Sequence, residues 1–301
     1  MLKIRAELTP PRRMLVSTVA VIAFLLLWFI LTWPLLPPLP PVSATVADAT
    51  QADEGDYQPP EAIADGAEEA EAPGPRPLIP AYILPSPQAV LVAVVVLHTD
   101  HALVRSAARS LYRITLAFVL AALVAIPLGL WMGTYPPVKN VIEPLTGPLR
   151  YLPISAVYPL FILWFGIEDK MKVAFLFTGI VVYLLPLVIE AVMNVDQIYL
   201  DTAYTLGAKP HHIIFRVLLP GAWPGIFEAG RVLYGVGWTY VILAEIINAQ
   251  YGLGYLLTQA QRRNHIDWIY ALILVVLLLG VTTNYIFVFT GRRLFAWKEA
   301  D

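Results

Sequence analysis

Long apolar runs without a charged residue constrain the fold of this chain more than any other feature. Each is about the ~20 residues that cross the hydrocarbon core of a bilayer as a helix. They lie at Met14–Leu36, Ile114–Gly133, Tyr151–Ile167, Val173–Ile189 and Trp268–Gly291. A sixth run, Trp223–Ile247, contains Glu228, Arg231 and Glu245 near its ends. We count it as a span because an even number of crossings makes the charge pattern coherent.

The composition agrees with an all-α membrane protein of about six transmembrane helices. Only 14% of the residues are charged and 58% are hydrophobic, whereas a soluble domain carries roughly a quarter charged residues. The chain has no cysteine, which excludes disulfides and thiolate metal sites. His98 and His101, and the adjacent His211 and His212, lack further ligands in the pattern, so we expect no metal site.

Basic residues orient the chain, because Lys and Arg favour the cytoplasmic side of a membrane. They precede the first run and follow the second, fourth and sixth: Lys3, Arg5, Arg12, Arg13, Lys139, Lys209, Arg216, Arg292, Arg293 and Lys298. Both termini are therefore predicted to be cytoplasmic. The first run is longer than the ~7–15 residues of a signal-peptide core, which indicates an uncleaved anchor. We assign residues 1–36 to the cytoplasmic N-terminus and this first transmembrane helix.

An acidic stretch separates the first run from the others. Nine acidic residues and no Lys or Arg lie between Asp48 and Glu71. Such a segment buries too little apolar surface to offset its ordering entropy. We interpret residues 37–80 as a disordered, Pro/Ala-rich external insert. The alternatives are a docking surface for a basic external partner and a repulsive gate at the mouth.

The polar, basic segment Asp201–Pro220 has the pattern of two short helices with a break between them. Asn194 or Asp196 can cap the first helix. Gly207 supplies a left-handed C-terminal stop. Pro210 suits the first turn of the second helix.

Two prolines mark the end of this segment. We expect Pro220 to close the second helix and Pro224 to open the fifth span. Ala203 and Gly207 are small residues one turn apart, which lets a partner approach the backbone, and Lys209 offers charge. A stiff element of this kind transmits displacement, so we interpret it as a docking element for a soluble partner. The alternative is an interfacial connector with no partner.

The segment resembles the EAA signature of ABC importer permeases. That signature is Glu-Ala-Ala followed after three residues by Gly, after nine more by Ile, and after one more by Leu-Pro. At the same intervals this chain has Asp201-Thr202-Ala203, Gly207, Val217 and Leu219-Pro220. Asp201, Thr202 and Val217 depart from the signature residues.

Other motifs are similar to the nitrate/sulfonate/taurine branch of these permeases. They are Leu84-Pro85-Ser86-Pro87, Pro153-Ile154-Ser155-Ala156, Leu163-Trp164-Phe165-Gly166-Ile167, Gly235-Val236-Gly237-Trp238, Ala244-Glu245 and Gly252-Leu253-Gly254-Tyr255. The resemblance covers about residues 80–298 and leaves out the acidic insert. We accordingly assign residues 81–298 to a transmembrane permease domain with a cytoplasmic ATPase-docking loop at 194–222.

The resemblance implies a type I ABC importer permease fold in the bacterial inner (plasma) membrane. It implies a homodimer of this multi-pass chain on two copies of a cytoplasmic ABC ATPase. An external solute-binding protein would deliver a small solute, an anion such as nitrate, a sulfonate or taurine. The implied ATPase-docking residues are Asp201, Thr202, Ala203, Gly207, Ala208, Lys209, Val217, Leu219 and Pro220.

ATP and Mg²⁺ are expected on the partner subunit. The chain contains no G-x-x-x-x-G-K-[ST] phosphate loop, the backbone cradle that holds nucleotide phosphates. We therefore expect no enzymatic activity, no nucleic-acid partner and no cofactor on this chain.

Four residues inside the spans are candidates for the translocation path or a gate. An intramembrane carboxylate is costly and indicates function, so Glu245 is a candidate for a gate contact or a polar lock between subunits. We favour the alternative, a structural hydrogen bond to a neighbouring helix or to the Gly252–Gly254 turn. Pro153 and Pro159 can kink the third span, and the neighbourhood of Trp238 is expected to line the path.

Three other functional classes compete with a permease. A secondary transporter driven by an ion gradient would need charges buried in mid-span and an inverted repeat, whereas Glu190 and Glu245 lie near span ends and no repeat is clear. An intramembrane enzyme would need a nucleophile–base pair or a metal cluster. A membrane scaffold without transport activity would not need the docking signature.

Overall fold

The computed structural model describes residues 10–36, 76–77, 79–80, 82–247 and 250–297. The acidic stretch Asp48–Glu71 lies outside the described residues. The chain divides into two units, residues 1–92 and 93–301, and each is described by itself.

The first unit contains one long helix and a short strand pair. Helix α1 (Pro10–Thr32) ends just before Pro34, and strand β1 (Pro34–Leu36) pairs antiparallel with β2 (Arg76–Pro77). This pair is a small exception to the all-α prediction. The indole Nε1 of Trp28 donates a hydrogen bond to the carbonyl of Pro85 at 3.1 Å, and helix α3 (Pro87–Asp100) continues into the second unit.

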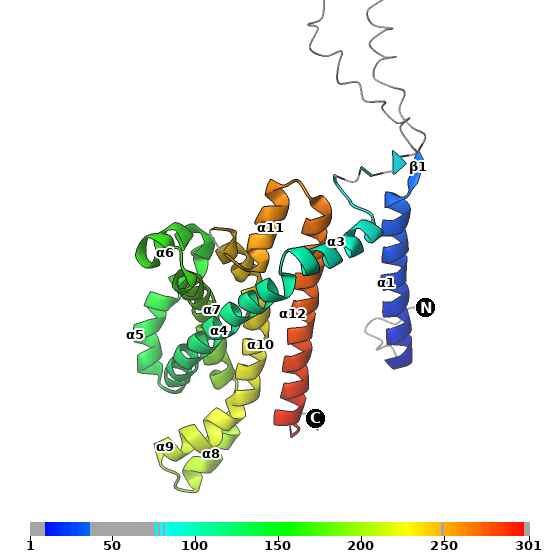
Figure 1. Cartoon of the computed structure of the whole chain (residues 1–301). Helices are drawn as coiled ribbons and strands as arrows, with labels where there is room; N and C mark the ends of the chain where they lie inside the picture. Colours follow the sequence, from blue (N-terminus) through cyan, green and yellow to red (C-terminus); the bar gives the residue numbers. More distant parts are fainter. Residues whose placement is uncertain (1–9, 37–75, 78, 81, 248–249, 298–301) are drawn as a thin grey trace, which may run out of the picture. The chain divides into compact units, whose positions relative to one another are not determined.

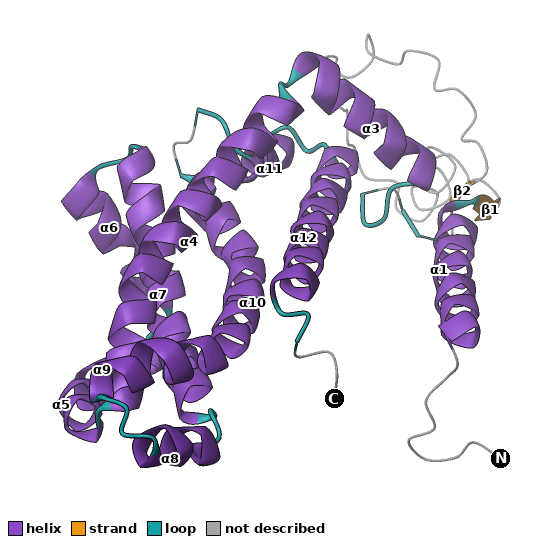
Figure 2. Ribbon diagram, turned by 90° about the horizontal axis from the view of Figure 1, so that it is seen from below, coloured by secondary structure: helices purple, strands orange, loops and turns teal. Residues whose placement is uncertain are grey.

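The second unit is helical throughout its described residues. Its elements are α4 (Leu103–Thr134), α5 (Pro136–Thr146), the 3-10 turns η2 (Pro148–Tyr151) and η3 (Ile154–Val157), α6 (Tyr158–Phe165), α7 (Asp169–Met193), α8 (Gln197–Thr205), α9 (Pro210–Ile213), the π-helical turn η4 (Ile214–Leu218), α10 (Leu219–Ile246), α11 (Leu253–Arg262) and α12 (Ile266–Leu294). Figures 1 and 2 both place α8 and α9 at one end of α10 and α11 at its other end.

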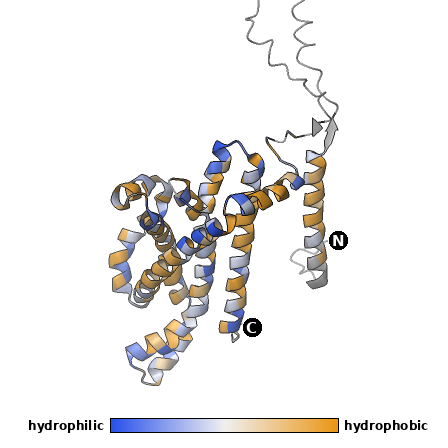
Figure 3. Ribbon diagram, viewed as in Figure 1, coloured by the Kyte–Doolittle hydropathy of each residue, from blue (hydrophilic) through white to orange (hydrophobic). Residues whose placement is uncertain are grey.

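Three helices of the described residues are long and apolar enough to cross a membrane, namely α4, α7 and α12. Figure 3 shows α12 as mainly hydrophobic down to a hydrophilic last turn, which contains Arg292 and Arg293. Helix α10 is similarly long, at 28 residues, but its charged residues and its Gly, Tyr and Trp make it less apolar. The apolar part of α1 that is described is shorter, Thr18–Thr32.

The predicted third span, Tyr151–Ile167, is helical over Ile154–Phe165, as η3 and α6, and a bend of 90° separates it from Pro136–Tyr151. Pro153 lies at this bend, where a kink is predicted. Pro159 lies in the first turn of α6, and the helical backbone continues past it. Proline lacks the amide N–H that would continue the helical ladder, so the sharp bend follows from the sequence.

Small residues let α4 approach α7 closely. They recur at every fourth position of α4: Ala117, Ala121, Ala125, Gly129 and Gly133. The three alanines are completely buried. A Cβ atom added at Gly129 would lie 2.6 Å from Val188 Cγ1, and one added at Gly133 would lie 2.7 Å from Val192 Cγ1. Such a stripe brings two backbones together where no hydrophobic force acts between helices in lipid.

A buried polar network joins α4, α7 and α10 near α11. Arg113 Nη1 lies 2.5 Å from Glu245 Oε1, and Arg113 Nη2 lies 2.6 Å from Asp169 Oδ1. Ser110 Oγ donates to the Glu245 carboxylate at 2.8 Å. Glu245 is fully buried. The pairing matters because an uncompensated charge at this depth would be strongly destabilising.

The turn between α10 and α11 closes over this carboxylate. The amide of Gly254 donates to Glu245 Oε2 at 3.0 Å, which confirms the predicted hydrogen bond to this turn. Gly252 adopts φ +146°, and a Cβ at this position would overlap the Glu245 carboxyl group. Both a left-handed backbone and the close approach therefore require glycine at position 252.

Packing between α4 and α7 gives the first test. Gly129→Val should lower the midpoint of thermal unfolding in detergent, by an amount corresponding to about 1–3 kcal/mol, because overpacking forces the helices apart. Gly235→Val is the matched control, since nothing lies within 4 Å of a Cβ at that position. Both variants change helix propensity equally, so equal midpoints would contradict the close-packing account.

The buried network gives the second test. Arg113→Met leaves the Glu245 carboxylate buried without its cation and should destabilise the protein by about 3–5 kcal/mol. The double variant Arg113→Met/Glu245→Gln should recover part of this loss, measured as the unfolding midpoint and the yield of monodisperse protein. Glu228→Gln, which breaks a half-exposed pair with Arg231, should cost less than about 1 kcal/mol. Equal effects of Arg113→Met and Glu228→Gln would refute the proposed role of the network.

Candidate functional site

The first helix of the predicted docking element is closed at its start by a side-chain cap. Asp196 Oδ1 accepts a hydrogen bond from the amide of Ile198 at 3.0 Å. Asp196, rather than Asn194, is thus the N-cap. This bond satisfies an amide that has no partner inside the helix.

A left-handed glycine ends this helix. Gly207 has φ +75°, its amide donates to Tyr204 O at 2.9 Å, and the Ala208 amide donates to Ala203 O at 3.0 Å. These two bonds form a Schellman motif. The predicted stop at Gly207 is confirmed, and the break between α8 and α9 has a defined geometry.

The predicted end of the second helix at Pro220 is wrong. Pro210 begins α9 as expected, but the helical backbone continues through η4 into α10, and Pro224 lies inside α10. Pro220 cannot donate a hydrogen bond to the carbonyl of residue 216. The turn over Ile214–Leu218 widens to a π-helix instead, with the Leu219 amide bonded to Ile214 O. Such a bulge lets the chain pass a proline without ending the helix.

The exposed face of this element combines polar and apolar side chains. Leu206 is 81% exposed, Phe215 64% and Tyr204 57%. Lys209 and Arg216 are also exposed. Figure 3 shows hydrophilic stretches on α8 and α9 that contrast with α12. Large apolar side chains gathered on a polar element are typical of a surface that a partner covers.

The signature residues lie together on this element. Asp201 accepts a hydrogen bond from Gln197 at 3.1 Å, and Thr202 Oγ1 donates to Ile198 O at 2.7 Å, yet both side chains stay exposed. Ala203 is the buried residue of α8. The remaining signature positions line the second half of the element: Gly207, Ala208, Lys209, Val217, Leu219 and Pro220.

The surroundings of His212 favour its neutral imidazole. Desolvation, followed by the nearby His211 and Arg216, lowers the pKa of His212.

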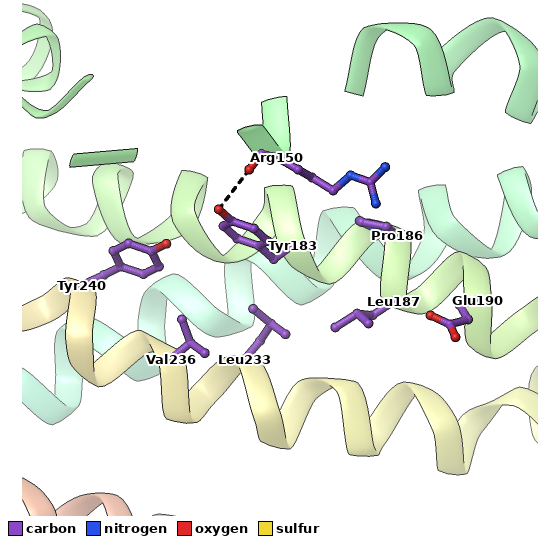
Figure 4. Close-up of a pocket in the computed structure, with 8 residues that line it drawn as sticks. All are labelled: Arg150, Tyr183, Pro186, Leu187, Glu190, Leu233, Val236 and Tyr240. Atoms are coloured by element: carbon purple, nitrogen blue, oxygen red, sulfur yellow. Dashed lines mark hydrogen bonds between the residues drawn. The ribbon is translucent and has the colours of Figure 1, made fainter. Parts of the chain in front are cut away.

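A cavity of about 360 Å³ lies between α7, α10 and the turn η2. Its lining residues are Arg150, Tyr183, Pro186, Leu187, Glu190, Leu233, Val236 and Tyr240. Figure 4 shows the α7 and α10 side chains facing each other across it, and the Tyr183 hydroxyl donating to the Arg150 carbonyl, a bond of 3.2 Å. Its size lies in the range of small-molecule sites.

The four path or gate candidates lie outside the lining of this cavity. Trp238 Nε1 donates to Thr283 Oγ1 of α12 at 3.4 Å, so its side chain is directed toward that helix. Glu245 is enclosed in the buried network. Pro153 and Pro159 are exposed residues of the bend before and within α6.

Sequence reasoning missed the cavity and the partner of Glu245. It named Glu190 only as a residue near a span end, and it assigned no role to Arg113, Arg150 or Tyr183. A usable signal was present in α7, where Tyr183 and Glu190 are seven residues apart and so share one helical face. Within the described residues, no group of three or more His, Cys, Asp or Glu is placed to hold a metal ion.

Among solved structures, the fold is similar to a chain of the MetNI methionine ABC transporter in an inward-facing conformation. The TM-score is 0.55 at 20% sequence identity, over 65% of this chain and 95% of that one. This likeness concerns the fold alone.

Sequence relatives agree with the fold. A probable ABC transporter permease protein of Brucella abortus is 34% identical over 219 residues, which is 73% of this chain and 88% of the relative. The taurine transport system permease protein TauC of Escherichia coli is 32% identical over 225 residues, 73% of this chain and 82% of that protein. Residues 125–296 match the model of the binding-protein-dependent transport system inner membrane component. The chain therefore belongs to that family, the membrane permeases of ABC importers.

Proposed function

We propose that this permease docks a cytoplasmic ABC ATPase through the loop at residues 194–222 and forms, as a homodimer, the path of a small solute across the bacterial inner membrane. An external solute-binding protein delivers the solute. ATP is hydrolysed on the ATPase, because this chain carries no phosphate loop. The solute is a small oxyanion-bearing molecule such as taurine, another sulfonate or nitrate, in keeping with the name of the taurine permease relative.

The observation that carries this proposal is the unbroken helical backbone from Pro210 to Ile246. At a rise of ~1.5 Å per residue, its 37 residues extend over roughly 55 Å. One end belongs to the exposed two-helix element. Leu233, Val236 and Tyr240 lie farther along the same continuous helical stretch and line the cavity. A displacement of the docked element therefore moves one wall of the cavity directly.

Charge and surface composition support a cytoplasmic position for the docking element. Basic residues gather at this element and at the C-terminal end of α12, and such residues favour the cytoplasm. The exposed Tyr204, Leu206 and Phe215 supply an apolar surface for a protein partner. Gly207 leaves open space around its Cα, so a partner can approach the backbone there.

The docking assignment is tested by co-purification with the co-expressed cognate ABC ATPase. Gly207→Trp places a bulky side chain on the docking face, and Asp201→Lys reverses a charge there; each should reduce recovery of the ATPase at least about tenfold, the loss expected from ~1.4 kcal/mol. Gly166→Trp is the matched control. Gly166 also has positive φ, at +72°, and open space around it, and it lies at the end of α6. Undiminished ATPase recovery with both docking variants would show that this element is not the contact.

A further inference from the structure

The cavity between α7 and α10 carries opposite charges that the protein leaves without a counter-ion. Glu190 is exposed, and within the described residues its side chain makes no hydrogen bond or ion pair. Among the residues that the structure describes, the Arg150 guanidinium has one weak bond, from Nε to the Gly147 carbonyl at 3.3 Å. Both residues line the cavity. Their charged groups are therefore available to a ligand.

Glu190 lies on α7, one of the helices apolar enough to span the membrane, directly after the apolar run Val173–Ile189 and three residues before the end of the helix. An ionisable side chain on such a helix that faces a cavity is a candidate for a substrate pathway. The rest of the α7 lining is apolar or aromatic, which leaves Glu190 as the anionic group of the cavity.

The two charged residues enter the site from different elements, Arg150 from η2 and Glu190 from α7. Tyr183, Leu187 and Glu190 form one stripe of α7, two helical turns or about 10 Å long. The hydroxyl of Tyr183 holds the backbone of Arg150 at the first end, and Glu190 occupies the second. Figure 4 shows the Arg150 side chain extending from beside Tyr183 toward Pro186, so its guanidinium lies on the side of Tyr183 nearer to Glu190. Leu233 and Val236 of α10 close the apolar middle.

We propose that this cavity is a substrate site for a small aliphatic zwitterion, with its oxyanion on Arg150 and its ammonium group on Glu190. The planar fork of a guanidinium can donate two hydrogen bonds to two oxygens of a carboxylate or a sulfonate. A simple anion would be attracted by the Arg150 guanidinium but repelled by the Glu190 carboxylate. Glu190 thus selects ammonium-bearing solutes over plain sulfonates. The inference rests on the proposed transport function, since it names the class of solute within that path.

The test measures direct binding to the full-length chain in lipid nanodiscs by saturation-transfer NMR, without the solute-binding protein. The probes are taurine, β-alanine and isethionate; isethionate has a hydroxyl group in place of the taurine ammonium. The wild-type protein should bind both zwitterions more tightly than isethionate. Glu190→Gln should weaken the binding of taurine and β-alanine about tenfold, the effect of losing ~1.4 kcal/mol. The binding of isethionate should be unchanged or tighter.

Arg150→Gln should weaken the binding of all three ligands, because each carries an oxyanion group. Glu143→Gln and Arg263→Gln are the matched controls, as both residues are exposed and lie outside the cavity, and neither should alter binding. The order of taurine and β-alanine identifies the preferred oxyanion as sulfonate or carboxylate.

Wild-type binding of isethionate in preference to taurine, or of none of the probes, would overturn the inference. So would an equal loss of all three ligands in Glu190→Gln. The assay requires no ATPase, so failure of this site and failure of ATPase docking are separate results.

Discussion

The ion pair between Arg113 and Glu245 is the interaction on which the arrangement of the central helices depends. Arg113 also binds Asp169 of α7 and the Tyr251 carbonyl, so one guanidinium touches α4's two neighbours and the turn before α11. Burial makes each group dependent on the others, because removing one partner leaves an uncompensated charge in a low dielectric. The close approach of α4 and α7 at Gly129 and Gly133 adds a second, apolar constraint over the remaining length of the pair.

The two-helix docking element projects from the helices that this network joins. The segment Gln197–Leu218 is stiffened by the Asp196 cap and by the Schellman turn at Gly207. Its second half is continuous with α10, because the proline at 220 widens one turn and does not end the helix. Force applied to the exposed element is therefore carried by the same helix that contributes a wall of the cavity and, at its far end, Glu245.

The cavity and the network use charge in different ways. In the network each charged group has an opposite partner at hydrogen-bond distance, which stabilises the fold and leaves little for a solute. In the cavity Arg150 and Glu190 lack such partners within the described residues. A charge at a water-accessible position of a membrane helix stays solvated and remains available to a ligand. Glu245 therefore stabilises the packing of the helices, whereas we infer that Glu190 binds the ammonium group of the solute.

The sequence by itself determined the membrane class, most helix positions, the cap at Asp196, the stop at Gly207 and the family resemblance, which the relatives confirm. These features are local: apolar length, capping chemistry and motif spacing act within a few residues. It did not determine that Pro220 would be bridged by a π-turn or that Trp238 would face α12. Only the tertiary structure decided that Arg113 meets Glu245, 132 positions away, and that Arg150 and Glu190 share a cavity. Pairings of this kind depend on which helix faces pack together, and many partners are compatible with the same local pattern.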